Sequence, residues 1–176
     1  MIGALEQRRS PILLTERKDH LEYFAAQLSR IARHVVLQGG MSPSVRREVK
    51  RQLAIIADAE ERVVIATGRY IGEGFDDARL DTLFLALPVS WKGTLVQYAG
   101  RLHRLHKAKQ EVQVFDYVDR GVPVLWRMFQ KRLRGYRGLG YARGEAPLGL
   151  GDTGDDLVVE YDEGVLRALN EQDDFK

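Results

Sequence analysis

The sequence predicts a doubly wound α/β domain on a mainly parallel sheet. Its 176 residues are 44% hydrophobic and 30% charged, which suits one globular domain with its own core. Short β-branched apolar runs alternate with helical patterns of about ten to fifteen residues. Near-continuous apolar strands separated by such helices indicate parallel pairing with both faces of the sheet covered.

The first part of the chain alternates strand and helix twice and then enters a third strand. The predicted strands are 11–15, 34–38 and 62–67, and the predicted helices are 19–32 and 43–57. In the first helix, apolar residues recur at helical spacing. The second follows Gly39-Gly40, with Ser42 as a plausible N-cap and Pro43 in the first turn, where proline is well tolerated.

The second part of the chain continues the alternation. We expect strands at 82–87 and 112–118 and helices at 94–105 and 122–136. After Tyr141 the periodicity fades, and 144–154 has the composition of a loop or linker. The predicted division is therefore a domain at 1–143 and an acidic, weakly ordered extension at 144–176.

Charge is distributed unevenly along the chain. From Lys92 to Arg143 there are 12 Lys/Arg against 3 Asp/Glu, whereas 144–176 holds 2 against 10. A basic stretch of that size can bind a polyanion such as nucleic acid or a nucleotide phosphate. The alternative is that the two ends neutralise each other on the surface.

The composition excludes several classes. Cysteine is absent, which excludes disulfides, thiolate chemistry and metal sites with Cys ligands. No run of about 18 apolar residues occurs, and the first ten residues are too charged for a signal peptide. We expect a soluble, cytoplasmic protein without membrane association.

Two segments carry the most specific chemistry. The first is the strand at 62–67 and the glycine-bearing loop after it, which ends in a carboxylate. Gly72 and Gly74 permit close backbone approach to a ligand, Asp76 can accept hydrogen bonds from ribose hydroxyls, and Thr67 offers a hydroxyl at a strand end. The alternative is a tight turn with a solvated Asp.

The second segment is a helical stripe of polar residues. Gln97, Gly100, Arg101 and Arg104 fall at i, i+3, i+4 and i+7, so they line one helical face. Guanidinium groups recognise phosphate, and an arginine beside a transferring phosphoryl group stabilises the charge that develops there. An exposed basic helix is the plain alternative.

Together the two segments resemble the last two motifs of superfamily-two helicases, in the C-terminal RecA-like domain. Gln-x-x-Gly-Arg-x-x-Arg matches 97–104 in full, and Ala-Thr followed by Gly-Glu-Gly-Phe-Asp matches 66–67 and 72–76. The pieces at 12–17 and 37–46 also agree with this domain. The resemblance covers about residues 10–140 and is closest to the branch of type III restriction subunits and other DNA translocases.

The resemblance implies a role for each matching residue. Arg104 is the implied arginine finger, Arg101 its neighbour at the phosphates, and Gln97 a support of that site. The implied ATP contacts are Gly72, Gly74 and Asp76; the implied nucleic-acid contacts are Thr67, Gly39, Gly40, Arg46 and Arg17. Such contacts reach the phosphate backbone, so we expect strong salt dependence and weak base specificity.

The sequence departs from a complete helicase in one large respect. It contains no Gly-x-x-x-x-Gly-Lys-Ser/Thr and no Asp-Glu box after a strand. The P-loop lysine and the Mg²⁺ ligands must then come from a missing N-terminal RecA-like half, and the chain alone should not hydrolyse ATP. The two leading hypotheses are the C-terminal motor half of an ATP-dependent DNA helicase or translocase, and a stand-alone nucleic-acid-binding module.

Three weaker sequence patterns suggest other kinds of site. The Gly-x-Gly-x-x-Gly at 149–154 lacks a flanking strand and helix, so a dinucleotide site there is improbable. His103 and His106 have metal-ligand spacing but no third ligand nearby, which favours a structural or nucleic-acid-facing role. A set of aromatic residues with interleaved arginines could form a nucleic-acid surface, given the basic charge of this stretch: Arg132, Arg134, Tyr136, Arg137, Tyr141 and Arg143.

Overall fold

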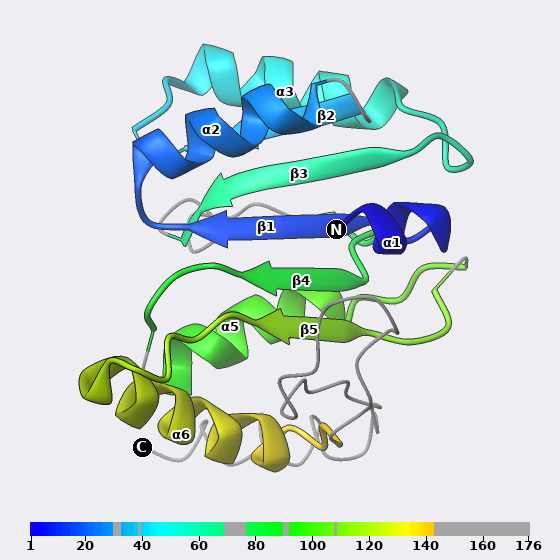
Figure 1. Ribbon diagram of the computed structural model, residues 1–176. Helices are drawn as coiled ribbons and strands as arrows, with labels where there is room; N and C mark the ends of the chain where they lie inside the picture. The colour runs from blue at the N-terminus through cyan, green and yellow to red at the C-terminus, as the bar shows by residue number, and fades with distance from the viewer. Residues whose placement is uncertain (30–32, 39, 69–76, 90–91, 108, 143–176) are drawn as a thin grey trace.

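The sheet and its helices follow one another in the predicted alternation (Figure 1). The computed structural model describes residues 1–29, 33–38, 40–68, 77–89, 92–107 and 109–142. Its elements are α1 (Ile2–Glu6), β1 (Pro11–Thr15), α2 (Lys18–Leu28), β2 (Arg33–Leu37), α3 (Pro43–Ile55), β3 (Arg62–Thr67), β4 (Thr82–Leu85), α5 (Lys92–Leu102), β5 (Gln113–Asp116) and α6 (Pro123–Gly138).

All five strands pair in parallel, in the order β2-β3-β1-β4-β5. Leu13 of β1 is in register with Ile65 of β3 on one side and with Phe84 of β4 on the other. The predicted doubly wound α/β fold is confirmed.

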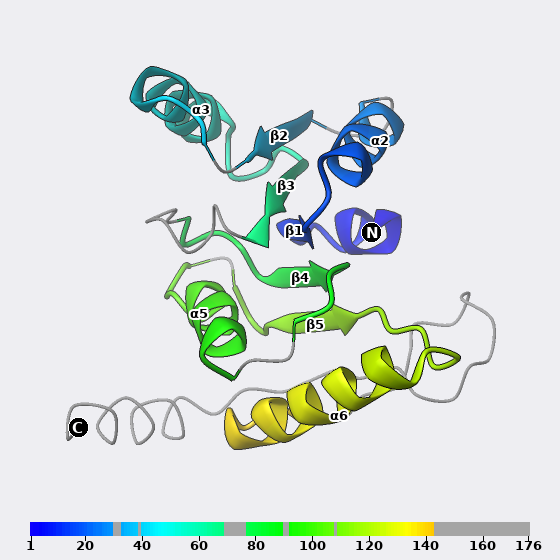
Figure 2. The ribbon, with the colours of Figure 1, turned by 90° about the vertical axis from the view of Figure 1, so that its left-hand side faces the viewer.

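Helices cover both faces of the sheet (Figure 2). One core cluster joins one face to side chains of α3, α5 and the end of α6, and includes Leu14, Leu37, Leu53 and Leu95. The other cluster joins the opposite face to α1 and α2, and includes Leu5, Leu21, Ile65 and Phe84. Neighbouring residues of β3 alternate between the clusters, as strand geometry requires.

The connections explain why helices lie on both faces. The chain crosses the sheet in one direction from β1 to β2 and in the opposite direction from β4 to β5. Right-handed crossovers therefore place α2 and α5 on opposite faces. β1 and β4 are direct neighbours, and their connections diverge at this point. In such sheets a crevice forms outside the carboxyl ends of the two diverging strands.

Several predicted boundaries differ from the structure. The helix expected at 94–105 ends at Leu102, because Lys109 folds back and donates from Nζ to the carbonyls of Leu102 (2.6 Å) and Arg104 (2.8 Å). β4 ends at Leu85 and β5 spans only Gln113–Asp116. Ser42 does cap α3, accepting from the Val45 amide at 3.4 Å. Helix α1 was not anticipated.

Candidate functional site

The carboxyl ends of β1, β2 and β3 bring part of the predicted nucleic-acid set to one edge of the sheet. Thr67 is the last residue of β3 and is buried, whereas Gly40 follows β2 with an exposed backbone at φ +83°. Only glycine adopts such a φ without strain, which accounts for Gly40 at this turn. Arg46 lies in the first turn of α3 and donates from Nε to the Met41 carbonyl at 3.1 Å.

Arg17 lies at the same edge, directly before α2. Its guanidinium donates from Nε to Asp19 at 3.0 Å, and both side chains are exposed. The hydrogen bond from Arg17 lowers the pKa of Asp19 to about 2. The pair leaves the guanidinium at the surface, where a phosphate can compete for it in solvent.

A contact among three segments joins this edge to α5. A Cβ on Gly68 would lie 2.4 Å from the Tyr98 hydroxyl and 3.1 Å from a Glu16 carboxylate oxygen. The absence of a side chain at Gly68 therefore lets the Tyr98 ring approach the end of β3. Burial and the nearby Glu16 charge raise the pKa of Tyr98 to about 12, so its hydroxyl stays protonated.

The predicted arginine stripe is placed only in part as expected. Gln97 is exposed and Arg101 is partly buried on α5, but Arg104 lies exposed two residues after the helix ends. The prediction that all four residues share one continuous helical face is thus wrong for Arg104. Lys109, which contacts the backbone there, is what ends the helix early.

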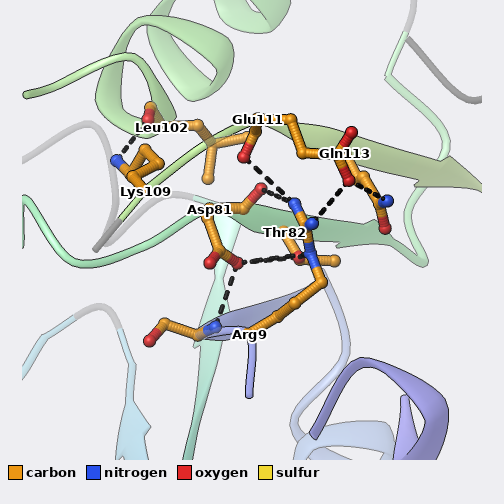
Figure 3. Close-up of polar contacts among 8 residues, drawn as sticks. Arg9, Asp81, Thr82, Leu102, Lys109, Glu111 and Gln113 are labelled. Atoms are coloured by element: carbon orange, nitrogen blue, oxygen red, sulfur yellow. Dashed lines mark hydrogen bonds and ion pairs between the residues drawn. The ribbon is translucent and has the colours of Figure 1, made fainter. Parts of the chain in front are cut away.

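The end of α5 that carries these arginines points to the amino ends of the strands. Figure 3 shows Leu102 and Lys109 beside Asp81, Glu111 and Gln113, which precede or begin β4 and β5. Lys107 also forms an ion pair at 3.3 Å with Asp58, in the segment before β3. The structure therefore separates Arg101 and Arg104 from Thr67 and Gly40, which lie toward opposite ends of the sheet.

Four predicted site residues lie outside the described residues. They are Gly39, Gly72, Gly74 and Asp76. The described chain continues through Gly68, after the end of β3, and resumes at Asp77, shortly before β4. Their roles remain predictions.

A dense polar network closes the amino end of the sheet (Figure 3). Arg9 donates to Thr82 Oγ1 at 2.6 Å and to Glu111 Oε1 at 2.7 Å. Asp81 accepts from the Ser10 amide at 2.9 Å and from the Thr82 hydroxyl at 2.8 Å. This network ties the start of β1 to β4 and β5, and sequence reasoning missed it because Arg9 lies outside every motif.

A second buried network holds α6 to the end of β5. Arg132 donates to the two carboxylate oxygens of Asp116 at 2.6 and 2.8 Å, and both side chains are 2% exposed. Tyr136 donates to the same carboxylate at 3.0 Å. The interpretation of Arg132, Tyr136 and Tyr141 as a nucleic-acid surface is wrong, because all three are buried.

His103 has a structural position. Its Nε2 lies 2.7 Å from the Tyr141 hydroxyl. Burial, with a smaller effect of the Lys109 charge, lowers the pKa of His103 to about 4, so the ring is neutral at pH 7. Among the residues that the structure describes, no three His, Asp or Glu side chains gather as a metal site.

An apolar groove lies beyond the carboxyl ends of β4 and β5. It has a volume of about 680 Å³, and its walls include Phe24, Phe84, Tyr117 and Leu125. Phe84 stacks on Phe115 with ring centroids 4.8 Å apart. Sequence patterning did not reveal this groove, because it depends on which helices cover which strands.

None of the described helices is both long and apolar enough to cross a membrane. No protein-family model matches the chain. The fold is similar to the C-terminal part of the Fun30 ATPase domain, with a TM-score of 0.61 and 15% identity over 96% of this chain. It is also similar to T4 UvsW, with a TM-score of 0.54 and 12% identity over 98% of this chain. The chain spans 49% of the Fun30 structure and 30% of the UvsW structure.

These likenesses show the RecA-like α/β fold of helicase-type domains. At the level of sequence, the chain is 38% identical over 84 residues to uncharacterized protein 108L of Invertebrate iridescent virus 3. That match covers 47% of this chain and 75% of the viral protein. On these grounds the chain belongs to the same family as the 108L protein.

Proposed function

We propose that this chain is the C-terminal motor half of an ATP-dependent DNA helicase or translocase. One observation carries the proposal: on a RecA-like sheet, α5 presents Gln97 and Arg101 and ends just before an exposed Arg104. The fold it shares with the C-terminal part of the Fun30 ATPase domain supports the same assignment.

In this proposal the arginine end of α5 meets the nucleotide. Arg104 is the arginine finger toward the γ-phosphate of ATP, Arg101 is its neighbour, and Gln97 supports the site. Gly72, Gly74 and Asp76 complete the nucleotide contacts of this chain. The exposure of Arg104 supports its role, because a finger acts on a nucleotide bound largely by another domain.

Nucleic acid, by the same proposal, binds at the carboxyl ends of β1 to β3. Its backbone is contacted by Thr67, Gly39, Gly40, Arg46 and Arg17. The separation of this edge from the arginine end of α5 suits a motor, because nucleotide and nucleic acid must be bound at the same time without overlap.

In this proposal ATP binds together with Mg²⁺, and the missing N-terminal RecA-like half holds the metal. The residues of this chain fit one part of that task, since Arg101 and Arg104 supply positive charge for phosphates. They do not fit the metal-binding part, because the described residues form no carboxylate or histidine cluster. Bound ATP would supply the phosphoryl group whose developing charge Arg104 stabilises.

The second candidate is a stand-alone nucleic-acid-binding module derived from such a domain. The observation that favours it is the exposed guanidinium of Arg17 together with the exposed Gly40 turn at the carboxyl edge. The donors at the carboxyl edge can bind a phosphate backbone without ATP. This candidate keeps that edge and assigns no catalytic role to Arg104.

Sequencing the DNA upstream of this coding region tests the two candidates first. A reading frame with a P-loop and an acidic box supports the motor, and its product should restore DNA-stimulated ATP hydrolysis when combined with this chain. In that assembly Arg104→Ala should lower kcat by about 10³-fold or more and leave nucleotide binding nearly intact.

Matched variants make the assay specific. Arg104→Lys keeps the charge but loses the forked guanidinium, so it should recover only a small part of the turnover. Arg47→Ala, at an exposed position on α3, should behave as the wild type. Unchanged turnover in Arg104→Ala would remove Arg104 from the mechanism. Absence of any ATPase half, with salt-sensitive oligonucleotide binding, would support the module instead.

A further inference from the structure

The outer side of α6 carries a group of cations that the fold does not use. Arg127, Lys131 and Arg134 recur at i, i+4 and i+7, and Arg137 follows one turn later; all four side chains are exposed. The opposite side of the helix is buried through Phe129, Arg132, Gly135 and Tyr136. We name the four exposed residues the α6 cation stripe.

These four cations form no ion pair with the described residues. None of them makes an ion pair or a side-chain hydrogen bond there, and α6 itself contains no Asp or Glu. Other exposed arginines do have partners: Arg17 pairs with Asp19 and Arg51 with Glu48. The positive charge of the stripe is therefore available at the surface for an anionic partner.

We propose that this partner is the acidic C-terminal segment of the same chain, residues 144–176. That segment holds 10 Asp/Glu against 2 Lys/Arg, so its charge is opposite to that of the stripe. It begins six residues after α6 ends at Gly138, so both partners are present at high local concentration. The inference does not depend on the motor assignment.

The chain is long enough to make this contact. The 16 residues of α6 span about 24 Å, at about 1.5 Å per residue. Residues 143–156 could cover about 46 Å if extended, at about 3.3 Å per residue. The acidic residues from Asp155 to Glu163 can therefore reach back along the whole stripe.

The contact should respond strongly to salt. Its charges lie at the surface, and the Debye length falls from about 10 Å at 0.1 M salt to about 3 Å at 1 M. Salt should therefore release the segment without unfolding the domain, whose core is apolar.

The lack of cysteine in the chain makes a distance measurement direct. Gln130→Cys on the exposed side of α6 and Asn170→Cys in the acidic segment would carry a donor and an acceptor dye in the full chain. We expect efficient energy transfer at about 20 mM salt and at least a twofold loss of it at 1 M salt.

Charge reversal identifies the surface involved. Arg127→Glu, Lys131→Glu and Arg134→Glu together should reduce transfer at low salt to its level at 1 M salt. The matched control is Lys18→Glu, Arg47→Glu and Lys50→Glu, which changes net charge equally at exposed positions away from α6. The control should retain most of the transfer.

A second variant, with substitutions in the acidic segment, tests the same contact in case the α6 variant misfolds. Asp155→Asn, Asp156→Asn, Glu160→Gln, Asp162→Asn and Glu163→Gln should lower transfer in the same way. The proposal would be overturned if energy transfer did not change with salt concentration. It would also be overturned if energy transfer fell equally in the α6 variant and the control variant. So would an α6 reversal that leaves transfer intact but abolishes binding of a single-stranded oligonucleotide, which would assign the stripe to nucleic acid.

Discussion

Arginines at the two ends of strand β1 make opposite kinds of contact. At the amino end, Arg9 is partly buried against Asp81 and Glu111, and Arg62, at the start of the neighbouring β3, is buried against Asp77. At the carboxyl end, Arg17 is exposed beside a loop and pairs only with Asp19, two residues along the chain.

This difference shows what the fold needs and what it leaves for ligands. Both amino-end arginines are paired with carboxylates from another part of the sequence, and Arg9 also ties the start of β1 to β4. At the carboxyl ends of β1 and β2, Arg17 and Arg46 make local contacts that a ligand could replace, whereas Arg132 beside the end of β5 is buried against Asp116. The number of arginines in a segment is therefore a poor guide to function until the topology places each of them.

The largest effect should come from Arg62. Its guanidinium lies 2.6 Å from an Asp77 carboxylate oxygen, and the two side chains are 4% and 12% exposed. Arg62→Ala leaves Asp77 without its partner, so unfolding free energy in urea should fall by about 3–5 kcal/mol. Arg47→Ala on the exposed side of α3 should change it by less than about 0.5 kcal/mol. Equal losses in both variants would refute the contrast between the two ends.

Arg9 should come next. Arg9→Ala removes the bonds to Thr82 and Glu111 and the ion pair with Asp81, which should cost about 2–3 kcal/mol in the same urea experiment. Arg9→Lys keeps the charge but cannot reach several acceptors at once, so it should recover part of this loss. If Arg9→Lys recovered the full unfolding free energy, the positive charge alone, and not the forked guanidinium, would account for the stabilisation at the amino end of the sheet.

Gly68 tests the contact between the carboxyl edge and α5. Gly68→Ala places a methyl group 2.4 Å from the Tyr98 hydroxyl, so the ring must move and stability should fall by about 1–3 kcal/mol. Adding Tyr98→Phe removes that hydroxyl and should restore part of the loss, which a double-mutant cycle measures as coupling. Strictly additive effects would mean that the two residues do not meet.

His103 extends the comparison to pH. Its folded pKa of about 4 is below the unfolded value of about 6.5, so the folded state binds fewer protons between these pH values. The stabilisation that comes from the neutral His103 ring should therefore be fully present above pH 6.5. It should be lost on acidification, by about 1–2 kcal/mol at pH 5 for this partly exposed ring. His103→Gln should flatten the profile of urea midpoints between pH 7 and 5. An unchanged profile would assign the acid sensitivity to other groups.

Arg104 should have the smallest effect on the fold. It is exposed beyond the end of α5, so Arg104→Ala should leave the unfolding free energy within about 0.5 kcal/mol of the wild type. Thermal unfolding and urea midpoints measure this directly. A loss above about 2 kcal/mol would mean that Arg104 belongs with the cross-linking arginines, and a loss of ATP turnover could then not be assigned to chemistry.

The fold was largely predictable because its signals are local. Apolar runs marked all five strands, and the Ser42-Pro43 pair marked the start of α3. The end of α5 was not predictable, since it depends on Lys109, which returns to the helix from seven residues beyond Leu102.

The site was less predictable than the fold. Motif spacing selected Gln97 and Arg101 on α5 correctly as neighbours on one helix, but it could not show that their end of the helix lies away from Thr67. Nor could it distinguish buried Arg132 from exposed Arg134, two positions apart on α6. Burial of an arginine depends on a carboxylate such as Asp116, which lies 16 residues away.

Gly135 lies where α6 packs closely against α5. A Cβ at this position would lie 2.9 Å from a Leu95 methyl group, so α6 rests almost directly on α5. Close-packed interiors resist compression, so α6 cannot approach α5 further without displacing it. A displacement of α6, by the acidic segment or by another polyanion, should therefore also shift α5, the helix that carries Arg101.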